Sequence, residues 1–159
     1  MDELWLKVAA IPKKVVSGML VGEFQHNIDA KGRMIMPAKF RDELGEKFVI
    51  TKGLDKCLFV FSQEEWEKLD QKLSEQPLSK GRDIQRFFYG GMAECELDKQ
   101  GRLLIPQTLR DYSGLEKDVV FVGLAKRAEI WSKSKWDEQN AKFIENSDDV
   151  ALQMEDLGI

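Results

Sequence analysis

The stretch IDAKGRMIMP at Ile28–Pro37 is spelled a second time as LDKQGRLLIP at Leu97–Pro106. Each copy has an aspartate, three residues, an arginine, three apolar residues and a proline. With an offset of 69 residues, which becomes 70 after one insertion, the match runs as far as Trp66 in the first copy and Trp136 in the second. A match of this length indicates an internal duplication rather than a chance motif.

Each copy predicts the same series of elements. Two short strands flank the turn, and a helix begins at the proline, which tolerates the first helical turn, and ends at a glycine. Two more strands and a closing helix follow. The expected strands are 21–28, 34–36, 47–51 and 57–61 in the first copy, and 92–97, 103–105, 118–122 and 128–131 in the second.

The closing helices have clear starting signals. Ser62 is expected to cap the first one, with Glu65 completing a capping box and a hydrophobic staple formed by Phe61 and Trp66. Ser132 repeats the cap in the second copy, with Trp131 and Trp136 as its staple. Between the copies, residues 74–81 are expected to form a linker and residues 83–89 a short helix.

The duplicated turn fits a tight hairpin. Asp29 and Asp98 stand at the first turn position, where a carboxylate accepts the backbone N–H two residues on. Gly32 and Gly101 stand where a bulged hairpin loop needs a positive φ. These four residues are therefore predicted to structure the two loops.

The basic residues of the loops have no such local explanation. Turn formation does not ask for Arg33 and Arg102 after the glycine, nor for Lys31 and Lys99 within the loop. One interpretation is a solvated surface on which each arginine pairs with its own aspartate. The other is a loop tip whose arginine contacts base edges or phosphates, for which a guanidinium fork is suited.

Composition limits the other classes of function. The chain of 159 residues is 43% apolar and 33% charged, as expected for a soluble globular protein, and it holds no apolar run of membrane-spanning length. The first residues, MDELWLKVAAIPKK, do not fit a secretory signal, which favours the cytoplasm. Cys57 and Cys95 are expected to be reduced thiols, and His26, the only histidine, to be a strand residue. We therefore expect no metal, no cofactor, no catalytic residue, no small-molecule substrate and no membrane partner.

The charge of the chain is unevenly distributed. Residues 137–159 carry a net charge of −6, which leaves +2 on residues 1–136 although the whole chain is at −4. The turns are more basic still, at +3 for Asp29–Arg41 and +2 for Asp98–Arg110. The acidic overall balance therefore does not exclude a nucleic-acid partner.

The two copies resemble the halves of the MraZ family, bacterial proteins made of two AbrB-like (SpoVT-AbrB) swapped-hairpin units with a D-x-x-x-R signature. The signature reads DAKGR at Asp29–Arg33 and DKQGR at Asp98–Arg102, and the resemblance runs from about Met19 to about Ala141. It implies an α+β, β-rich fold in which two tandem β-barrel units are related by pseudo-two-fold symmetry and each is followed by a helix.

The resemblance also implies a function. MraZ proteins are understood as sequence-specific, DNA-binding transcriptional regulators of the division and cell-wall gene cluster, which bind direct repeats in promoter DNA as ring-shaped homo-oligomers. It implies a cytoplasmic, nucleoid-associated protein in which Arg33 and Arg102 contact DNA, Lys31 and Lys99 flank them, and no reaction is catalysed. The alternative is an antitoxin-like or assembly module that acts through protein contacts without DNA.

The expected organisation has five segments. Residues 1–18 form an N-terminal extension, disordered or non-native, that precedes the family pattern. The first SpoVT-AbrB repeat covers 19–73, a linker with a short helix covers 74–90, the second repeat covers 91–141, and an acidic tail covers 142–159.

Overall fold

The computed structural model describes residues 19–159, so the expected N-terminal extension lies outside the described residues. The first repeat contains β1 (Leu20–Asn27), β2 (Arg33–Ile35), α2 (Ala38–Leu44), β3 (Lys47–Lys52), the short 3-10 helix η1 (Leu54–Lys56), β4 (Leu58–Ser62) and α3 (Gln63–Ser74). After α4 (Leu78–Gly91), the second repeat contains β5 (Ala93–Glu96), β6 (Arg102–Leu104), α5 (Gln107–Ser113), β7 (Asp118–Ala125), β8 (Ala128–Ser132) and α6 (Lys133–Glu145). The last element is α7 (Ser147–Asp156).

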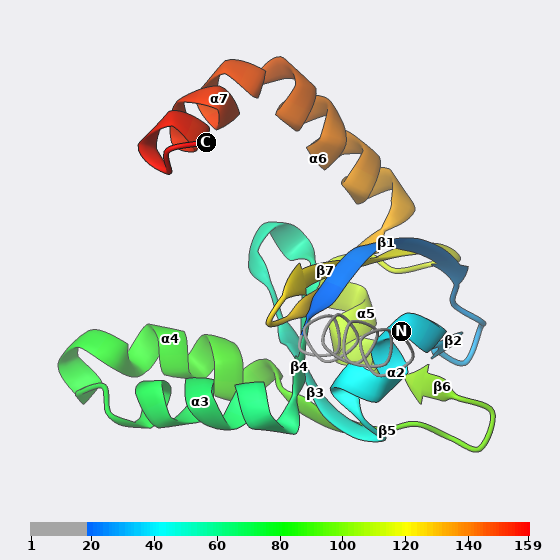
Figure 1. Ribbon diagram of the computed structural model, residues 1–159. Helices are drawn as coiled ribbons and strands as arrows, with labels where there is room; N and C mark the ends of the chain where they lie inside the picture. The colour runs from blue at the N-terminus through cyan, green and yellow to red at the C-terminus, as the bar shows by residue number, and fades with distance from the viewer. Residues whose placement is uncertain (1–18) are drawn as a thin grey trace, which may run out of the picture.

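The main sheet mixes strands of both repeats. Its six strands run in the order β1-β7-β8-β4-β3-β5, and every neighbouring pair is antiparallel. The first strand of each repeat thus pairs with the third strand of the other, β1 with β7 and β5 with β3 (Figure 1). This exchange confirms the tandem swapped-hairpin fold, and it means that neither repeat completes its sheet alone.

The short strands β2 and β6 form a separate antiparallel ribbon, again with one strand from each repeat. The pairs are Arg33 with Leu104, Met34 with Leu103, and Ile35 with Arg102. Met34 pairs with Leu103, its equivalent in the other repeat, and the two outer pairs are equivalent to each other. The pseudo-two-fold axis that relates the repeats therefore passes through the centre of the ribbon. The predicted strands 34–36 and 103–105 each lie one residue further along the chain than the observed ones.

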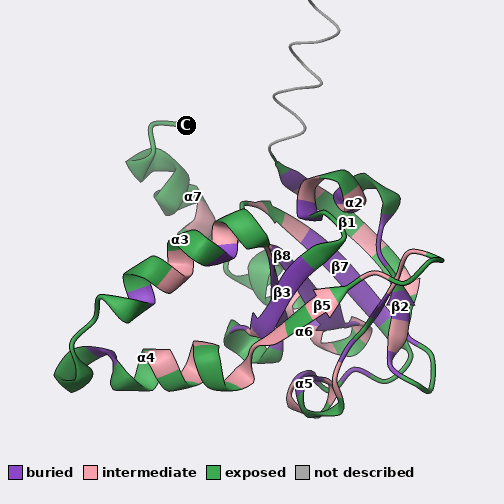
Figure 2. Cartoon of the chain, turned by 90° about the horizontal axis from the view of Figure 1, so that it is seen from below, coloured by how far each residue is buried: buried purple, intermediate pink, exposed green. Residues whose placement is uncertain are grey.

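The main core lies under this ribbon. Met34 and Leu103 on its inner face are fully buried together with Phe40 of α2 and Leu109 of α5. The Phe40 ring lies 5.1 Å from that of Phe121 on β7, so a helix of the first repeat packs on a strand of the second. Figure 2 shows that buried residues gather on the strands, while α4 and α7 are largely exposed. Burial of apolar surface from both repeats makes the core common to them.

The closing helices begin as predicted. The Ser62 hydroxyl accepts the Glu65 N–H at 3.2 Å, and the Ser132 hydroxyl accepts the Lys135 N–H at 3.3 Å. The ring centroids of the first staple, Phe61 and Trp66, lie 6.2 Å apart, and those of the second lie 5.4 Å apart. The capping box is the exception. The Glu65 carboxylate accepts from Lys68 Nζ at 3.2 Å, and among residues 19–159 it makes no bond to the N–H of its cap.

Two segments are more helical than the sequence patterns predict. The linker expected over 74–81 is interrupted by α4, which begins at Leu78 and runs four turns, because Pro77 precedes it in the extended conformation that starts a helix. The expected acidic tail is also helical, as the end of α6 followed by α7. Within residues 19–159, no helix combines the length and the apolar character that a bilayer crossing needs.

Candidate nucleic-acid interface

The first loop, Asp29–Arg33, is closed by the side chain of its aspartate. Asp29 Oδ1 accepts the backbone N–H groups of Lys31 at 3.0 Å and Arg33 at 2.9 Å. The Gly32 N–H donates to the Asp29 carbonyl at 3.0 Å, and Gly32 has a φ of 87°. The structure thus places Asp29 and Gly32, the predicted loop-structuring residues, in the hydrogen bonds that close the loop.

The second loop, Asp98–Arg102, repeats the arrangement. Asp98 Oδ1 accepts from the N–H groups of Gln100 and Arg102, both at 2.9 Å. Gly101 has a φ of 76°, and its N–H donates to the Asp98 carbonyl at 3.0 Å. Two stretches 69 residues apart in the sequence thus fold into the same turn.

The arginine of each loop has a structural partner. Arg33 Nε donates to Asp29 Oδ2 at 2.8 Å, and Arg102 Nε donates to Asp98 Oδ2 at 2.8 Å. The pairing of each arginine with its own aspartate was one of the two interpretations left open by the sequence, and the structure shows it, because the Nε–H group donates to the aspartate that shapes the turn. The ion pair holds the guanidinium in one orientation and leaves its two Nη groups for a partner, since neither makes a hydrogen bond within residues 19–159.

The loop hydrogen bonds also lower the pKa values of the two aspartates. The backbone N–H of Arg33 is the main cause of the lowered pKa of Asp29, assisted by the guanidinium of the same residue and opposed by partial desolvation. The backbone N–H of Arg102 lowers the pKa of Asp98 in the same way. Both carboxyl groups are thus ionised at neutral pH, and the ion pairs are formed there.

A second arginine reaches each loop from the other repeat. Arg41 of α2 donates from Nε to the Met36 carbonyl at 3.2 Å, and its guanidinium lies over Gly101. A Cβ added to Gly101 would lie 2.6 Å from Arg41 Cζ, so only glycine leaves room for the contact. Arg110 of α5 occupies the equivalent place over Gly32, where an added Cβ would lie 2.7 Å from its Nε.

These cross-repeat arginines were not among the predicted site residues. Within residues 19–159, Arg41 and Arg110 form no ion pair with a carboxylate, so their charge is available to an anion. The matched positions of Arg41 and Arg110 in the duplication were the signal that pointed to a shared role. What the sequence does not show is that each arginine serves the opposite loop.

Both lysines of the loops are exposed. Lys31 and Lys99 make no side-chain hydrogen bond or ion pair within the described part of the chain. Each loop therefore gathers three cations: Lys31, Arg33 and Arg110 at the first, and Lys99, Arg102 and Arg41 at the second.

The two loops are joined through the β2–β6 ribbon. The Met36 N–H donates to the Gly101 carbonyl at 3.0 Å, and the Ile105 N–H donates to the Gly32 carbonyl at 2.8 Å. Each loop is thus tied to the strand that leaves the other. In Figures 1 and 2 the loops lie at the side of the molecule opposite the α3–α4 hairpin.

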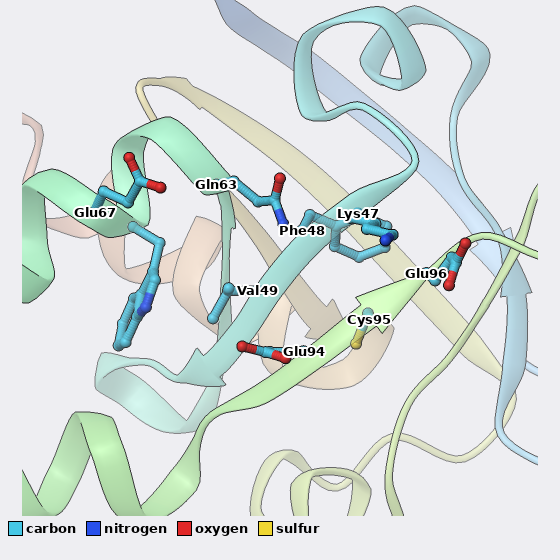
Figure 3. A pocket seen from close by; sticks show the side chains of 9 residues that line it. Lys47, Phe48, Val49, Gln63, Glu67, Glu94, Cys95 and Glu96 are labelled. Atoms are coloured by element: carbon cyan, nitrogen blue, oxygen red, sulfur yellow. The ribbon is translucent and has the colours of Figure 1, made fainter.

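A hollow between α3 and the strands β3 and β5 differs from the two loops in its charge (Figure 3). Its charged lining is mostly acidic, with Glu67, Glu94 and Glu96 against Lys47, so it is unsuited to a phosphate backbone. Burial raises the pKa of the Cys95 thiol to about 11, which keeps it protonated and a poor nucleophile at neutral pH. In the described part of the chain, no cluster of histidine, cysteine and acidic residues fits a metal ion.

Together these features define a class: a tandem swapped-hairpin protein of the AbrB type that presents two basic, arginine-bearing loops at one edge. The family described as "MraZ protein, putative antitoxin-like" matches residues 19–86 and 88–156. The chain belongs to the MraZ family. The second match extends beyond Ala141, where the resemblance noted in the sequence stops, and includes all of α7.

Two relatives match most of this chain over their own full length. A "Transcriptional regulator MraZ" of Thermoanaerobacter sp. (strain X514) is 54% identical over 143 residues, which is 89% of this chain and 100% of the relative. A protein of the same name from Acetivibrio thermocellus is 52% identical over 144 residues, with the same coverage. These names describe transcriptional regulators, which are not a class of enzyme.

Among solved structures, a solution structure of a Pyrococcus horikoshii protein aligns with a TM-score of 0.32 and 16% identity. It covers 67% of this chain and 91% of the other, and a likeness this low has no bearing on function.

Proposed function

We propose that the protein is a transcriptional regulator that binds promoter DNA through its two loops. The observation that carries the proposal is the pair of arginines, Arg33 and Arg102, each held by its own aspartate where its loop enters the β2–β6 ribbon. A guanidinium fixed in advance loses less conformational entropy on binding. Its two free Nη groups suit the O6 and N7 acceptors of guanine in the major groove.

The remaining cations are placed to neutralise phosphates. Lys31 and Arg110 flank the first arginine, and Lys99 and Arg41 flank the second. With four phosphates neutralised per protomer, the logarithm of the binding constant should fall with the logarithm of salt concentration with a slope of about −3.6. Phosphate contacts of this kind position the protein, while the base contacts supply sequence specificity.

One protomer offers only a modest binding surface, and the proposed active form is a ring-shaped homo-oligomer on direct repeats of a promoter in the division and cell-wall gene cluster. Linked copies raise the effective concentration at neighbouring boxes. The C-terminal helices support self-association because they expose apolar side chains at Phe143, Ile144, Leu152, Met154 and Leu157. The proposed location is the cytoplasm, in association with the nucleoid.

The test is a paired substitution. Arg33→Ala with Arg102→Ala should abolish retention of duplex DNA from the region upstream of the protein's own gene, with little change in the thermal midpoint. The matched control is Lys68→Ala with Lys133→Ala, which also removes one ion-paired cation from each repeat, at contacts of 3.2 Å and 2.6 Å to carboxylates. Equal DNA affinity of the loop variant and the control would refute the proposal.

The alternative is a protein–protein module, which the antitoxin-like description of the family favours. The exposed apolar side chains and net charge of the C-terminal segment would then carry the contact. This alternative would be supported if the protein bound a protein partner with an affinity that does not change with salt concentration and was not retained on promoter DNA.

A further inference from the structure

The outer face of the β2–β6 ribbon carries two exposed aliphatic side chains. Side chains alternate along a strand, so the buried Met34 and Leu103 leave their neighbours facing away from the core. Ile35 is 48% exposed and Leu104 is 56% exposed, at equivalent positions of the two repeats.

The strand register assembles these two residues with the loop arginines into one surface. Arg33 lies opposite Leu104, and Ile35 lies opposite Arg102. Directly opposed residues on one face have Cβ atoms about 4.5–5.5 Å apart. The four side chains therefore form what we call the ribbon patch, with arginines on one diagonal and aliphatic residues on the other.

A single exposed aliphatic residue needs no explanation, but Ile35 and Leu104 have the same position relative to the arginines in both repeats. Each stands two residues beyond the arginine of its own loop and across from the arginine of the other. Two residues along a strand span about 6.8 Å, close to two base-pair steps of about 3.4 Å. A two-stranded ribbon of this kind also fits the width of the major groove.

Duplex DNA suits the ribbon patch better than a second copy of the same surface. A symmetric contact between two copies of the patch would bring four arginines of like charge into one interface. The major groove instead offers guanine acceptors for the arginines and thymine methyl groups for the aliphatic side chains. The basic residues of both loops add the matching charge.

We propose that Ile35 and Leu104 contact the C5-methyl groups of thymines next to the bases that Arg33 and Arg102 contact, and so determine specificity for thymine at those positions. The inference rests on the proposed DNA-binding function and deepens it. Removing one contacted methyl group should weaken binding about fourfold, the effect of exposing one buried methyl-sized group.

The test compares thymine with deoxyuridine, which lacks only the C5-methyl group. The probe is a synthetic duplex of the site that the full-length wild-type protein selects from a randomised duplex pool. Each thymine is replaced in turn, and affinity is measured for the wild type and for Ile35→Ala with Leu104→Ala. The control variant is Leu124→Ala, an exposed leucine of β7 that is 43% accessible and lies outside the ribbon.

The wild type and Leu124→Ala should each lose about fourfold in affinity at one or two thymines. The ribbon variant should bind thymine and deoxyuridine duplexes equally at those positions and keep its fold, since both side chains are exposed. An undiminished response to deoxyuridine in the ribbon variant would overturn the inference.

Three other results would overturn it in distinguishable ways. If Arg33→Ala with Arg102→Ala abolishes DNA binding but no deoxyuridine duplex binds more weakly, the inference fails and the proposed function stands. If the ribbon variant keeps its DNA affinity and thymine response but loses oligomer mass in sedimentation, the patch contacts a second copy. Absence of any wild-type DNA binding would remove both proposals.

Discussion

Replacing Gly101 with alanine tests the contact between the two repeats at a single atom. The new Cβ would enter a positive-φ backbone and would lie within 2.9 Å of Arg41 Cζ, Nη1 and Nη2. The guanidinium of Arg41 would have to leave, and its hydrogen bond to the Met36 carbonyl at 3.2 Å would be lost with it. The substitution therefore combines backbone strain with the loss of a cross-repeat contact.

The two costs can be estimated separately. A non-glycine residue in the left-handed region costs about 1–2 kcal/mol, and loss of the hydrogen bond costs about 0.5–1.5 kcal/mol. The free energy of unfolding should thus fall by about 1.5–3.5 kcal/mol. Gly114→Ala is the control for strain without a cross-repeat contact, since its φ is 66° and the nearest atom to an added Cβ, at 3.0 Å, is Nζ of Lys135 in the same repeat, the flexible end of a side chain that donates to the Ser113 carbonyl. The gain from a less flexible unfolded chain is common to both variants.

The assay is urea unfolding of four proteins: the wild type, Gly101→Ala, Arg41→Ala and the double variant. In the Arg41→Ala background, Gly101→Ala should cost only the strain, similar to Gly114→Ala. The coupling energy between the two sites should be about 0.5–1.5 kcal/mol. A cost of Gly101→Ala that is equal in both backgrounds, within about 0.3 kcal/mol, would refute the cross-repeat contact.

Three further outcomes are expected. The folded-state pKa values of Asp29 and Asp98 are lowered, so the stability that these carboxylates contribute should be present above about pH 4 and be lost as pH falls further. Urea unfolding should therefore show that the variant Asp29→Asn with Asp98→Asn approaches the wild-type stability at pH 3 and differs from it most at pH 7. Gly123→Val should disrupt the β1–β7 pairing, because an added Cβ would lie 2.5 Å from the backbone of the facing strand; faster amide exchange throughout β1 checks this, and unchanged protection there would contradict it. Burial raises the pKa values of the Cys57 and Cys95 thiols, so both should react slowly with a disulfide reagent at pH 8 in the folded protein and at once in guanidinium; rapid labelling of native Cys57 would contradict its burial.

Local chemistry made much of the loop predictable from the sequence. Asp29 and Gly32 form a turn by contacts within five residues, and the staple of Phe61 and Trp66 is equally local. The duplication then transferred each assignment to the second copy. The tandem swapped-hairpin fold followed from the family resemblance and is confirmed by the strand exchange.

Contacts between distant residues were the part that the sequence did not show. Arg110 and Gly32 lie 78 positions apart, and nothing local indicates that one covers the other. The Arg33–Asp29 ion pair was one of two open interpretations, since the spacing permits both a paired and a free guanidinium. The length of α4 was underestimated because Ser, Lys and Gly near its start resemble a linker, whereas Pro77 sets the helix start.

The ribbon shared by the two repeats has a consequence for the direction in which the molecule can lie along a DNA duplex. A half-length chain with this fold would have to pair with an identical copy, and its two tips would be the same. Joining the halves in one chain allowed the tips to differ, and they read Ala30-Lys31 at one end and Lys99-Gln100 at the other. The protein thus has a front and a back along the ribbon, and successive molecules can point the same way.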